Sequence, residues 1–163
     1  LFFVPDEWKN IDIYSAHTNL DRTDGGTTDT LIDNLGLKAD EKSDFLRFVN
    51  LNTGLDEFVQ KLSKISPNLR YVNNNNIKTL SKIAFCAGSG SDFIHEAAVQ
   101  NADALVTGDV KFHTALESPI VLFDIGHFES EILVLDIFKS LLQNVETIKA
   151  NEKSPFFYNG NQS

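Results

Sequence analysis

The chain has 163 residues, of which 42% are hydrophobic and 23% are charged, which is the composition of an ordinary globular protein with a buried core. Its 14 Lys and Arg residues against 23 Asp and Glu residues give a net charge of −9 at neutral pH. A protein that binds nucleic acid nonspecifically must neutralise phosphates with basic side chains, so this charge argues against such binding. No apolar run approaches the roughly 18 residues of a membrane span, so we expect no membrane segment.

The first half of the chain alternates apolar stretches with helical patterns. The chain begins at Leu1 and contains no Met, so either it starts partway through a longer protein or residues are missing from it. The predicted elements, in chain order, are a strand at 11–15, a polar loop at 17–28, a helix at 29–37, an apolar strand at 45–51, a helix at 55–65 and an asparagine-rich loop at 73–76.

The second half is more regular, because each short apolar run is followed by a helical pattern. The predicted strands are 82–87, 104–107 and 120–125, and the predicted helices are 92–101, 113–117 and 129–143. The polar tail at 150–163 predicts a late strand or a frayed end. Alternation of strand and helix predicts an α/β fold with mainly parallel sheets flanked by helices.

The single cysteine, Cys86, excludes an intramolecular disulfide and a metal site made of cysteines alone. Its neighbours Ile83, Ala84 and Phe85 are apolar, which favours a buried structural thiol. We therefore expect a cytoplasmic protein.

Polar and reactive residues gather where the predicted strands end. In an open parallel sheet, ligands collect at the carboxyl ends of the strands, so these segments are expected to meet at one edge. They are Ala-His-Thr-Asn-Leu-Asp at 16–21, Gly-Ser-Gly-Ser at 88–91, Gly-Asp-Val-Lys-Phe-His at 108–113 and Gly-His-Phe-Glu-Ser-Glu at 126–131.

The last of these segments carries the sharpest chemical signal. His127 and Glu131 are four residues apart at the start of a predicted helix, so their side chains lie on one face. Imidazole and carboxylate together suit Zn, Fe, Mn or Ni. The alternative is that His127 caps the helix, while Glu129 and Glu131 interact with the helix dipole.

The other segments each allow a functional and a structural interpretation. Asp21 follows His17 by four residues and can reach the same cleft, or it can be a turn residue. Asp109, Lys111 and His113 can orient a substrate or support a ligand, or they can form a plain strand-to-helix turn.

The Gly-Ser-Gly-Ser segment at 88–91 can hold an anion on backbone N–H groups at a helix start. It lacks the spacing of the dinucleotide and phosphate-loop motifs, so a tight glycine turn is the stronger interpretation. His95, in the helix that follows, is expected to lie at the surface.

Taken together, the four segments resemble the Nif-three-like dinuclear-metal proteins, also called GTP cyclohydrolase I type 2 homologues. The resemblance runs in order from about residue 11 to residue 142. It implies that Asp21, His127 and Glu131 are metal ligands. The family's two other ligands are a neighbouring His-His pair upstream of the first motif, which this chain lacks. The residues Leu1-Phe2-Phe3 resemble the end of that upstream motif, so we expect the pair just before Leu1.

The resemblance also implies an architecture and an activity. It implies two divalent metal ions (Zn, Fe, Mn or Ni) in a cleft between two lobes, one formed by residues 1–21 with 132–163 and the other by residues 22–131. It implies metal-dependent hydrolysis of a nucleotide or another phosphate-bearing small molecule, with Asp21 as bridging ligand. His17, Lys111 and His113 are then candidates for proton transfer or substrate contact.

Two further classes stay open on the same resemblance: a non-catalytic metal-binding regulatory or interaction protein, and a metal-storage or delivery module. Members of the family that the chain resembles form rings of six subunits, so the resemblance implies a homo-hexamer. The aromatic cluster Phe156-Phe157-Tyr158 either marks a subunit contact or folds back onto its own sheet.

Overall fold

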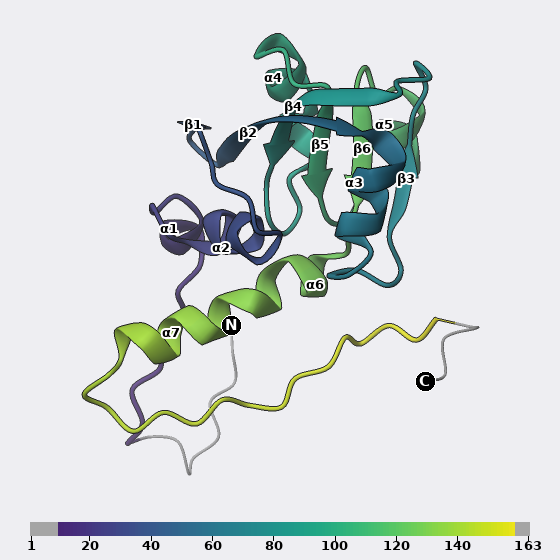
Figure 1. Cartoon of the computed structure of the whole chain (residues 1–163). Coiled ribbons are helices and arrows are strands. Elements are labelled where there is room, and N and C mark those ends of the chain that lie inside the picture. Colours follow the sequence, from purple (N-terminus) through teal and green to yellow (C-terminus); the bar gives the residue numbers. More distant parts are fainter. Residues whose placement is uncertain (1–9, 159–163) are drawn as a thin grey trace.

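A single six-stranded sheet forms the centre of the computed structural model, which describes residues 10–158 (Figure 1). The strand order is β1-β2-β4-β5-β6-β3. The strands are β1 (Glu41–Ser43), β2 (Leu46–Gly54), β3 (Arg70–Val72), β4 (Thr79–Phe85), β5 (Ala104–Thr107) and β6 (Val121–Asp124). The helices are α1 (Thr18–Asp21), α2 (Thr27–Asn34), α3 (Leu55–Leu62), α4 (Ile94–Val99), α5 (Phe112–Leu116), α6 (His127–Glu131) and α7 (Leu135–Leu141), with 3-10 turns at Ser91–Phe93 and Ile132–Val134.

The three central strands are parallel, as the sequence predicted. Ala104 pairs with Ile83 of β4 on one side and with Val121 of β6 on the other. All residues of β5 and β6 are buried, which is typical of parallel strands covered on both faces. The sheet as a whole is mixed rather than mainly parallel, because β1, β2 and β3 pair antiparallel with their neighbours.

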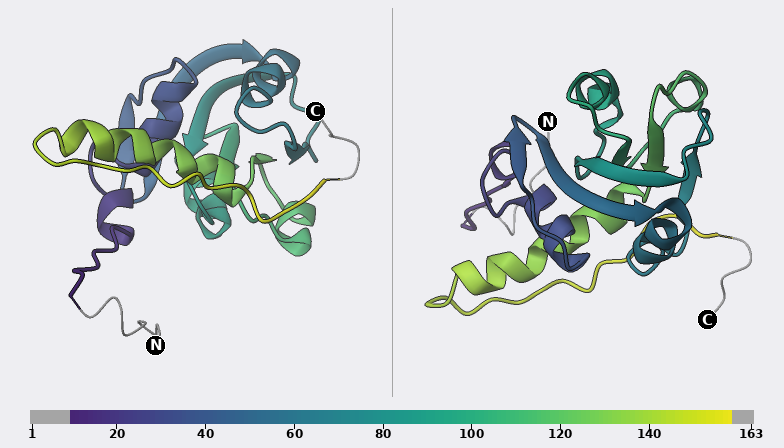
Figure 2. Two further views of the ribbon diagram at one scale, coloured as in Figure 1. Left: turned by 90° about the horizontal axis from the view of Figure 1, so that it is seen from below. Right: turned by 45° about the horizontal axis from the view of Figure 1, so that its top comes forward.

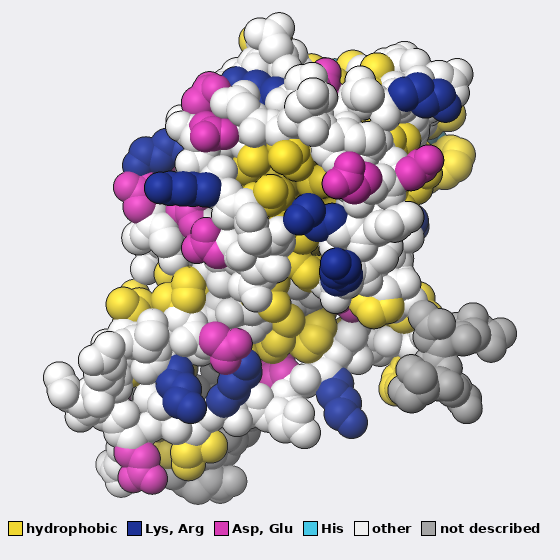
Figure 3. Space-filling view, viewed as in Figure 1, with side chains coloured by type: hydrophobic (Ala, Val, Ile, Leu, Met, Phe, Trp, Pro, Cys, Tyr) yellow, Lys and Arg dark blue, Asp and Glu magenta, His cyan; other side chains and the backbone are white. Residues whose placement is uncertain are grey.

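Side chains that alternate along the central strands build two cores, one on each face of the sheet. Ile83, Phe85 and Phe123 pack with α2 and α3, and Phe58 of α3 lies between Phe85 and Phe123 with ring centroids 6.4 and 5.4 Å away. Ala84 and Leu105, on the opposite face, pack against α4. Figure 3 shows the hydrophobic side chains as a band down this view, with charged side chains on both sides.

Cys86 belongs to the core on the α4 face and is a free, buried thiol, as predicted. Burial raises its pKa to about 12, and the charges of Asp21 and Glu131 act in the same direction, while Arg47 opposes them.

Two short strands were not predicted, and one predicted strand is absent. The strands β1 and β3 have three residues each and mostly exposed side chains, so they show no hydrophobic alternation. The predicted strand at 11–15 is irregular and exposed. Within the described part of the chain it has no neighbouring strand to pair with, and an unpaired strand leaves its backbone groups to water.

The predicted helix over 129–143 is divided into α6, a 3-10 turn and α7. The apolar stripe of α7 has no buried residue, and α7 extends away from the sheet (Figure 1). The segment that follows, as far as residue 158, contains no strand and runs back along α7 and α6 (Figures 1 and 2). The rest of the tail for which a late strand or a frayed end was predicted, 159–163, and Leu1-Phe2-Phe3 lie outside the described residues.

The described residues hold one sheet, and the division into a lobe of 1–21 with 132–163 and a lobe of 22–131 stays a prediction. Between residues 10 and 158, none of the helices has the length and apolar character to cross a membrane.

Candidate metal centre

The turns that follow β4, β5 and β6 are hydrogen-bonded into one unit at the carboxyl edge of the parallel strands. The backbone N–H of Gly108 donates to the carbonyl of Gly88 (2.8 Å). The buried hydroxyl of Thr107 accepts from the N–H of Gly90 (2.7 Å) and donates to the carbonyl of Gly88 (3.1 Å). The predicted meeting at one edge is therefore observed for the segments that follow β4 and β5.

His127 and Glu131, which are one turn apart at the start of α6, lie on the same face of the helix. Nε2 of His127 lies 3.2 Å from Oε1 of Glu131, and the two side chains are 45% and 42% exposed. The N-cap of α6 is Gly126, and no side chain caps the helix. The helix-cap interpretation of His127 is therefore not supported.

Asp109 holds the other nitrogen of the same ring. Its Oδ2 lies 2.7 Å from Nδ1 of His127, so the imidazole bridges two carboxylates. Partial burial lowers the pKa of His127, but the hydrogen bond that its ring makes to Asp109 and the charges of Glu131 and Asp109 outweigh this effect and raise the pKa above its usual 6.5.

The absence of a side chain at Gly88 makes room for the side chains of His127 and Glu131. Its φ of +68° favours glycine, and a Cβ there would collide with Oε1 of Glu131 and lie 3.6 Å from Nε2 of His127. The N–H of Gly88 donates to the hydroxyl of Ser130 (2.8 Å), and the N–H of Gly90 is bonded to Thr107. Both glycine N–H groups thus have partners, which supports a tight turn rather than an anion cradle.

Asp21 ends α1, beside the same edge of the sheet. Its Oδ1 accepts a hydrogen bond from Thr27 at the start of α2 (2.8 Å), and the neighbouring Thr28 accepts from the N–H of Ala87, next to Gly88 (3.2 Å). The charges of Asp21 and Glu131 also both raise the pKa of Cys86. Convergence of Asp21 with His127 stays a prediction.

The three candidates for proton transfer are exposed, and their roles stay predictions. The Nδ1 atom of His17 lies 2.9 Å from the hydroxyl of Thr18. Lys111 precedes α5, and the ring of His113 packs edge-on against Phe112 with centroids 5.6 Å apart. His95 lies at the surface, as expected.

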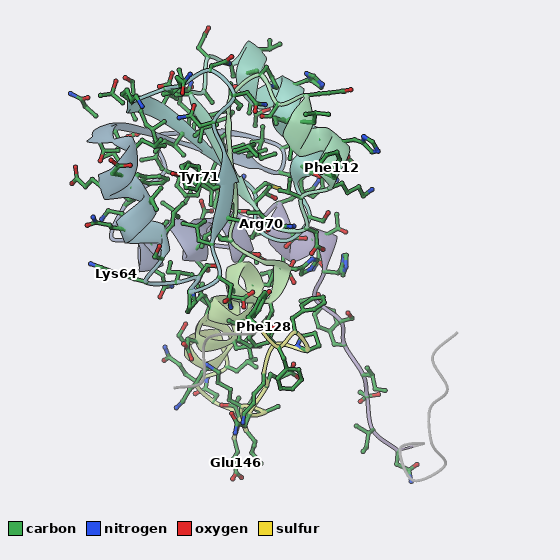
Figure 4. The ribbon with its side chains drawn as sticks, turned by 90° about the vertical axis from the view of Figure 1, so that its right-hand side faces the viewer. Lys64, Arg70, Tyr71, Phe112, Phe128 and Glu146 are labelled. Carbon is green, nitrogen blue, oxygen red and sulfur yellow. The ribbon has the colours of Figure 1, made fainter. Side chains whose placement is uncertain are left out.

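A cavity of about 270 Å³ opens beside His127, and sequence reasoning did not find it. Residues of β3 and α6 face it, among them Arg70 and Phe128, which lie on the same side of the molecule (Figure 4). Arg70 donates to Oδ2 of the buried Asp124 at 2.7 and 2.9 Å. No sequence signal marked this pair, because Arg70 lies on a short strand whose partner is 54 residues away.

The residues present fit part of a metal centre. A nitrogen and an oxygen of the types that divalent ions prefer lie side by side, next to a glycine where an added side chain would collide with them. Among residues 10–158, however, no cluster of three or more His, Cys, Asp or Glu side chains is arranged to hold an ion. His127 and Glu131 therefore fit as two ligands of a centre that needs further ligands.

Comparison with known proteins shows which proteins the chain resembles. The chain is 36% identical over 169 residues to a GTP cyclohydrolase 1 type 2 homolog of Clostridium perfringens and 35% identical over 159 residues to one of Campylobacter jejuni. These matches include 90% and 93% of the chain, which spans only 64% of the length of either relative.

Two solved structures share the fold. The first is Staphylococcus aureus hypothetical protein SA1388, with a TM-score of 0.75 and 24% identity over 87% of this chain and 67% of that one. The second is reduced HcgD from Methanocaldococcus jannaschii, with a TM-score of 0.68 and 28% identity over 80% of this chain and 56% of that one. Residues 8–157 match the family described as Duf34/NIF3 (NGG1p interacting factor 3), and the chain belongs to this family.

Proposed function

We propose that this protein binds divalent metal ions through His127 and Glu131, with Asp21 as the bridging ligand. The observation that carries the proposal is the 3.2 Å approach of Nε2 of His127 to Oε1 of Glu131 beside Gly88, where an added Cβ would collide with the Glu131 carboxylate. Further ligands would complete a dinuclear centre of Zn, Fe, Mn or Ni, in a cleft between two lobes.

We further propose that the centre serves hydrolysis of a nucleotide or another phosphate-bearing small molecule. A bound pair of divalent ions supplies Lewis acidity and the positive charge that a chain of net charge −9 lacks. The cavity beside His127 is the place for the substrate, and Arg70 is a cation on its wall. The exposed side chains of His17, Lys111 and His113 are free to approach a substrate and move a proton.

The test combines metal content with turnover. Elemental analysis of the full-length protein should find two divalent ions per chain, and metal-loaded protein should hydrolyse GTP. Both should be lost in Asp21→Ala. Asp24→Ala is the matched control, because Asp24 is an exposed acid in the same loop that pairs with Lys42 instead. Equal metal content in the Asp21→Ala variant and the wild type would contradict the ligand assignment.

A non-catalytic role as a metal-binding regulatory or interaction factor is the second candidate. It is supported by exposed apolar side chains on the segment after α7, such as Ile148 and Phe157, which are 92% and 98% exposed. Full metal content without turnover of GTP or other nucleotides would favour this role, or a role in metal storage or delivery, over hydrolysis.

The same exposed groups support a proposal for assembly. We expect a cytoplasmic homo-hexamer in which the Phe156-Phe157-Tyr158 cluster contributes to subunit contacts. Phe156 and Tyr158 also line the cavity beside His127, so subunit contact would shape the proposed substrate site. Light scattering of the full-length protein at physiological salt tests this, and a stable monomer mass would contradict it.

A further inference from the structure

We propose that Asp109 is a positioning residue that fixes the tautomer and the orientation of the His127 ring. Its carboxylate lies 2.7 Å from Nδ1, whereas Glu131 lies 3.2 Å from Nε2. A neutral imidazole has one N–H, and that proton belongs on the nitrogen with the shorter, better bond to a carboxylate. The proton therefore stays on Nδ1, and the lone pair of Nε2 lies on the side of the ring that faces Glu131 and Gly88.

The backbone conformation around Asp109 places its carboxylate next to the His127 ring. Asp109 has a φ of +54°, a left-handed conformation that costs energy in a residue with a side chain, although Asp tolerates it better than most. Gly108, just before it, is packed so closely on the first residue of α6 that a Cβ would lie 2.7 Å from the backbone nitrogen of His127. The turn after β5 and the start of α6 are therefore in close backbone contact. Among the hydrogen bonds of the described residues, the one to His127 is the only one that accounts for the left-handed backbone of Asp109.

The role of Asp109 extends the proposed function, since a ligand imidazole is usually oriented by a carboxylate or carbonyl on its second nitrogen. Its effect on the ring, however, is present before any metal binds. The inference about the tautomer therefore stands or falls separately from the proposal that the chain binds metal.

The decisive measurement is the ¹⁵N NMR signature of the His127 ring in metal-free full-length protein, at an alkaline pH where the ring is neutral. We expect the proton on Nδ1 in the wild type. In Asp109→Ala, only Glu131 remains as a partner, so the proton should move to Nε2. A wild-type ring protonated on Nε2, or a tautomer that does not change in the variant, would overturn the inference.

A second measurement is Zn²⁺ affinity by competition with a chromophoric chelator. Asp109→Asn keeps the shape of the side chain and its tolerance of the left-handed backbone, and it should weaken binding by about 10- to 100-fold. The matched control is Asp44→Asn, because Asp44 also has a positive φ (43°) but its carboxylate pairs with Arg22 and not with His127. Unchanged affinity in Asp109→Asn would contradict the positioning role. A wild type that binds no Zn²⁺ would contradict the proposed function and leave the NMR result to decide the inference.

Discussion

Substitution of Gly108 by alanine should damage stability and the site together. Gly108 lies at the end of β5 and is buried, and an added Cβ would lie 2.7 Å from the backbone nitrogen, 2.9 Å from Cα of His127 and 2.8 Å from the carbonyl carbon of Gly126. These are backbone atoms, so no side chain can rotate away, and the start of α6 must move. Overpacking of this kind costs about 1–3 kcal/mol.

Urea and thermal unfolding would measure the loss of stability. For a chain of this size, each kcal/mol lowers the melting temperature by about 2–4 °C. A displaced α6 also moves His127 relative to Asp109, so Zn²⁺ affinity should fall together with stability.

Two glycines provide controls for this experiment. A Cβ on Gly54 meets no atom within 4 Å, so Gly54→Ala should be nearly neutral. Gly36 is equally open but has a φ of +67°, so Gly36→Ala should cost roughly 1 kcal/mol through backbone strain and leave Zn²⁺ affinity unchanged. If Gly108→Ala is no more destabilising than Gly54→Ala, the close packing of β5 against α6 is wrong.

Three further predictions concern titration and a buried charge. Because burial raises the pKa of Cys86 to about 12, its thiol should resist thiol reagents near pH 8 until the chain unfolds. The thiol of the unfolded chain ionises near pH 9 and that of the folded chain does not, so the free energy of unfolding should fall as the pH rises from 9 towards 12. The Cys86→Ser variant should show a smaller fall over this pH range. Because protons compete for a ring whose pKa lies above 6.5, Zn²⁺ affinity should already begin to fall above pH 6.5 as the pH is lowered, and an affinity independent of pH down to 6.5 would contradict the assigned role of His127. Arg47 is 2% exposed and donates to Asp29 and to backbone carbonyls, so Arg47→Met should lower the free energy of unfolding in urea by about 3–5 kcal/mol. As a control, Arg22→Met removes the exposed ion pair between Arg22 and Asp44 and should cost under about 1 kcal/mol.

Short-range pattern was enough to predict the centre of the fold. The runs at 82–87, 104–107 and 120–125 are apolar because both faces of β4, β5 and β6 are covered, and the helical patterns between them require crossover connections. These two facts together predict parallel neighbours. The mixed character of the sheet was not predictable, because β1 and β3 are three-residue edge strands whose pairing depends on distant partners.

In the candidate site, too, one contact follows from the local sequence and another depends on the tertiary structure. The pairing of His127 with Glu131 is a local property, because residues four apart on a helix share a face, and the sequence alone determined it. The bond between Asp109 and His127 spans 18 residues and exists only because β5 and β6 are parallel and in register, with Thr107 opposite Asp124. Only the tertiary structure could decide it, since two turns come within hydrogen-bond distance when the strands before them end at the same level of the sheet.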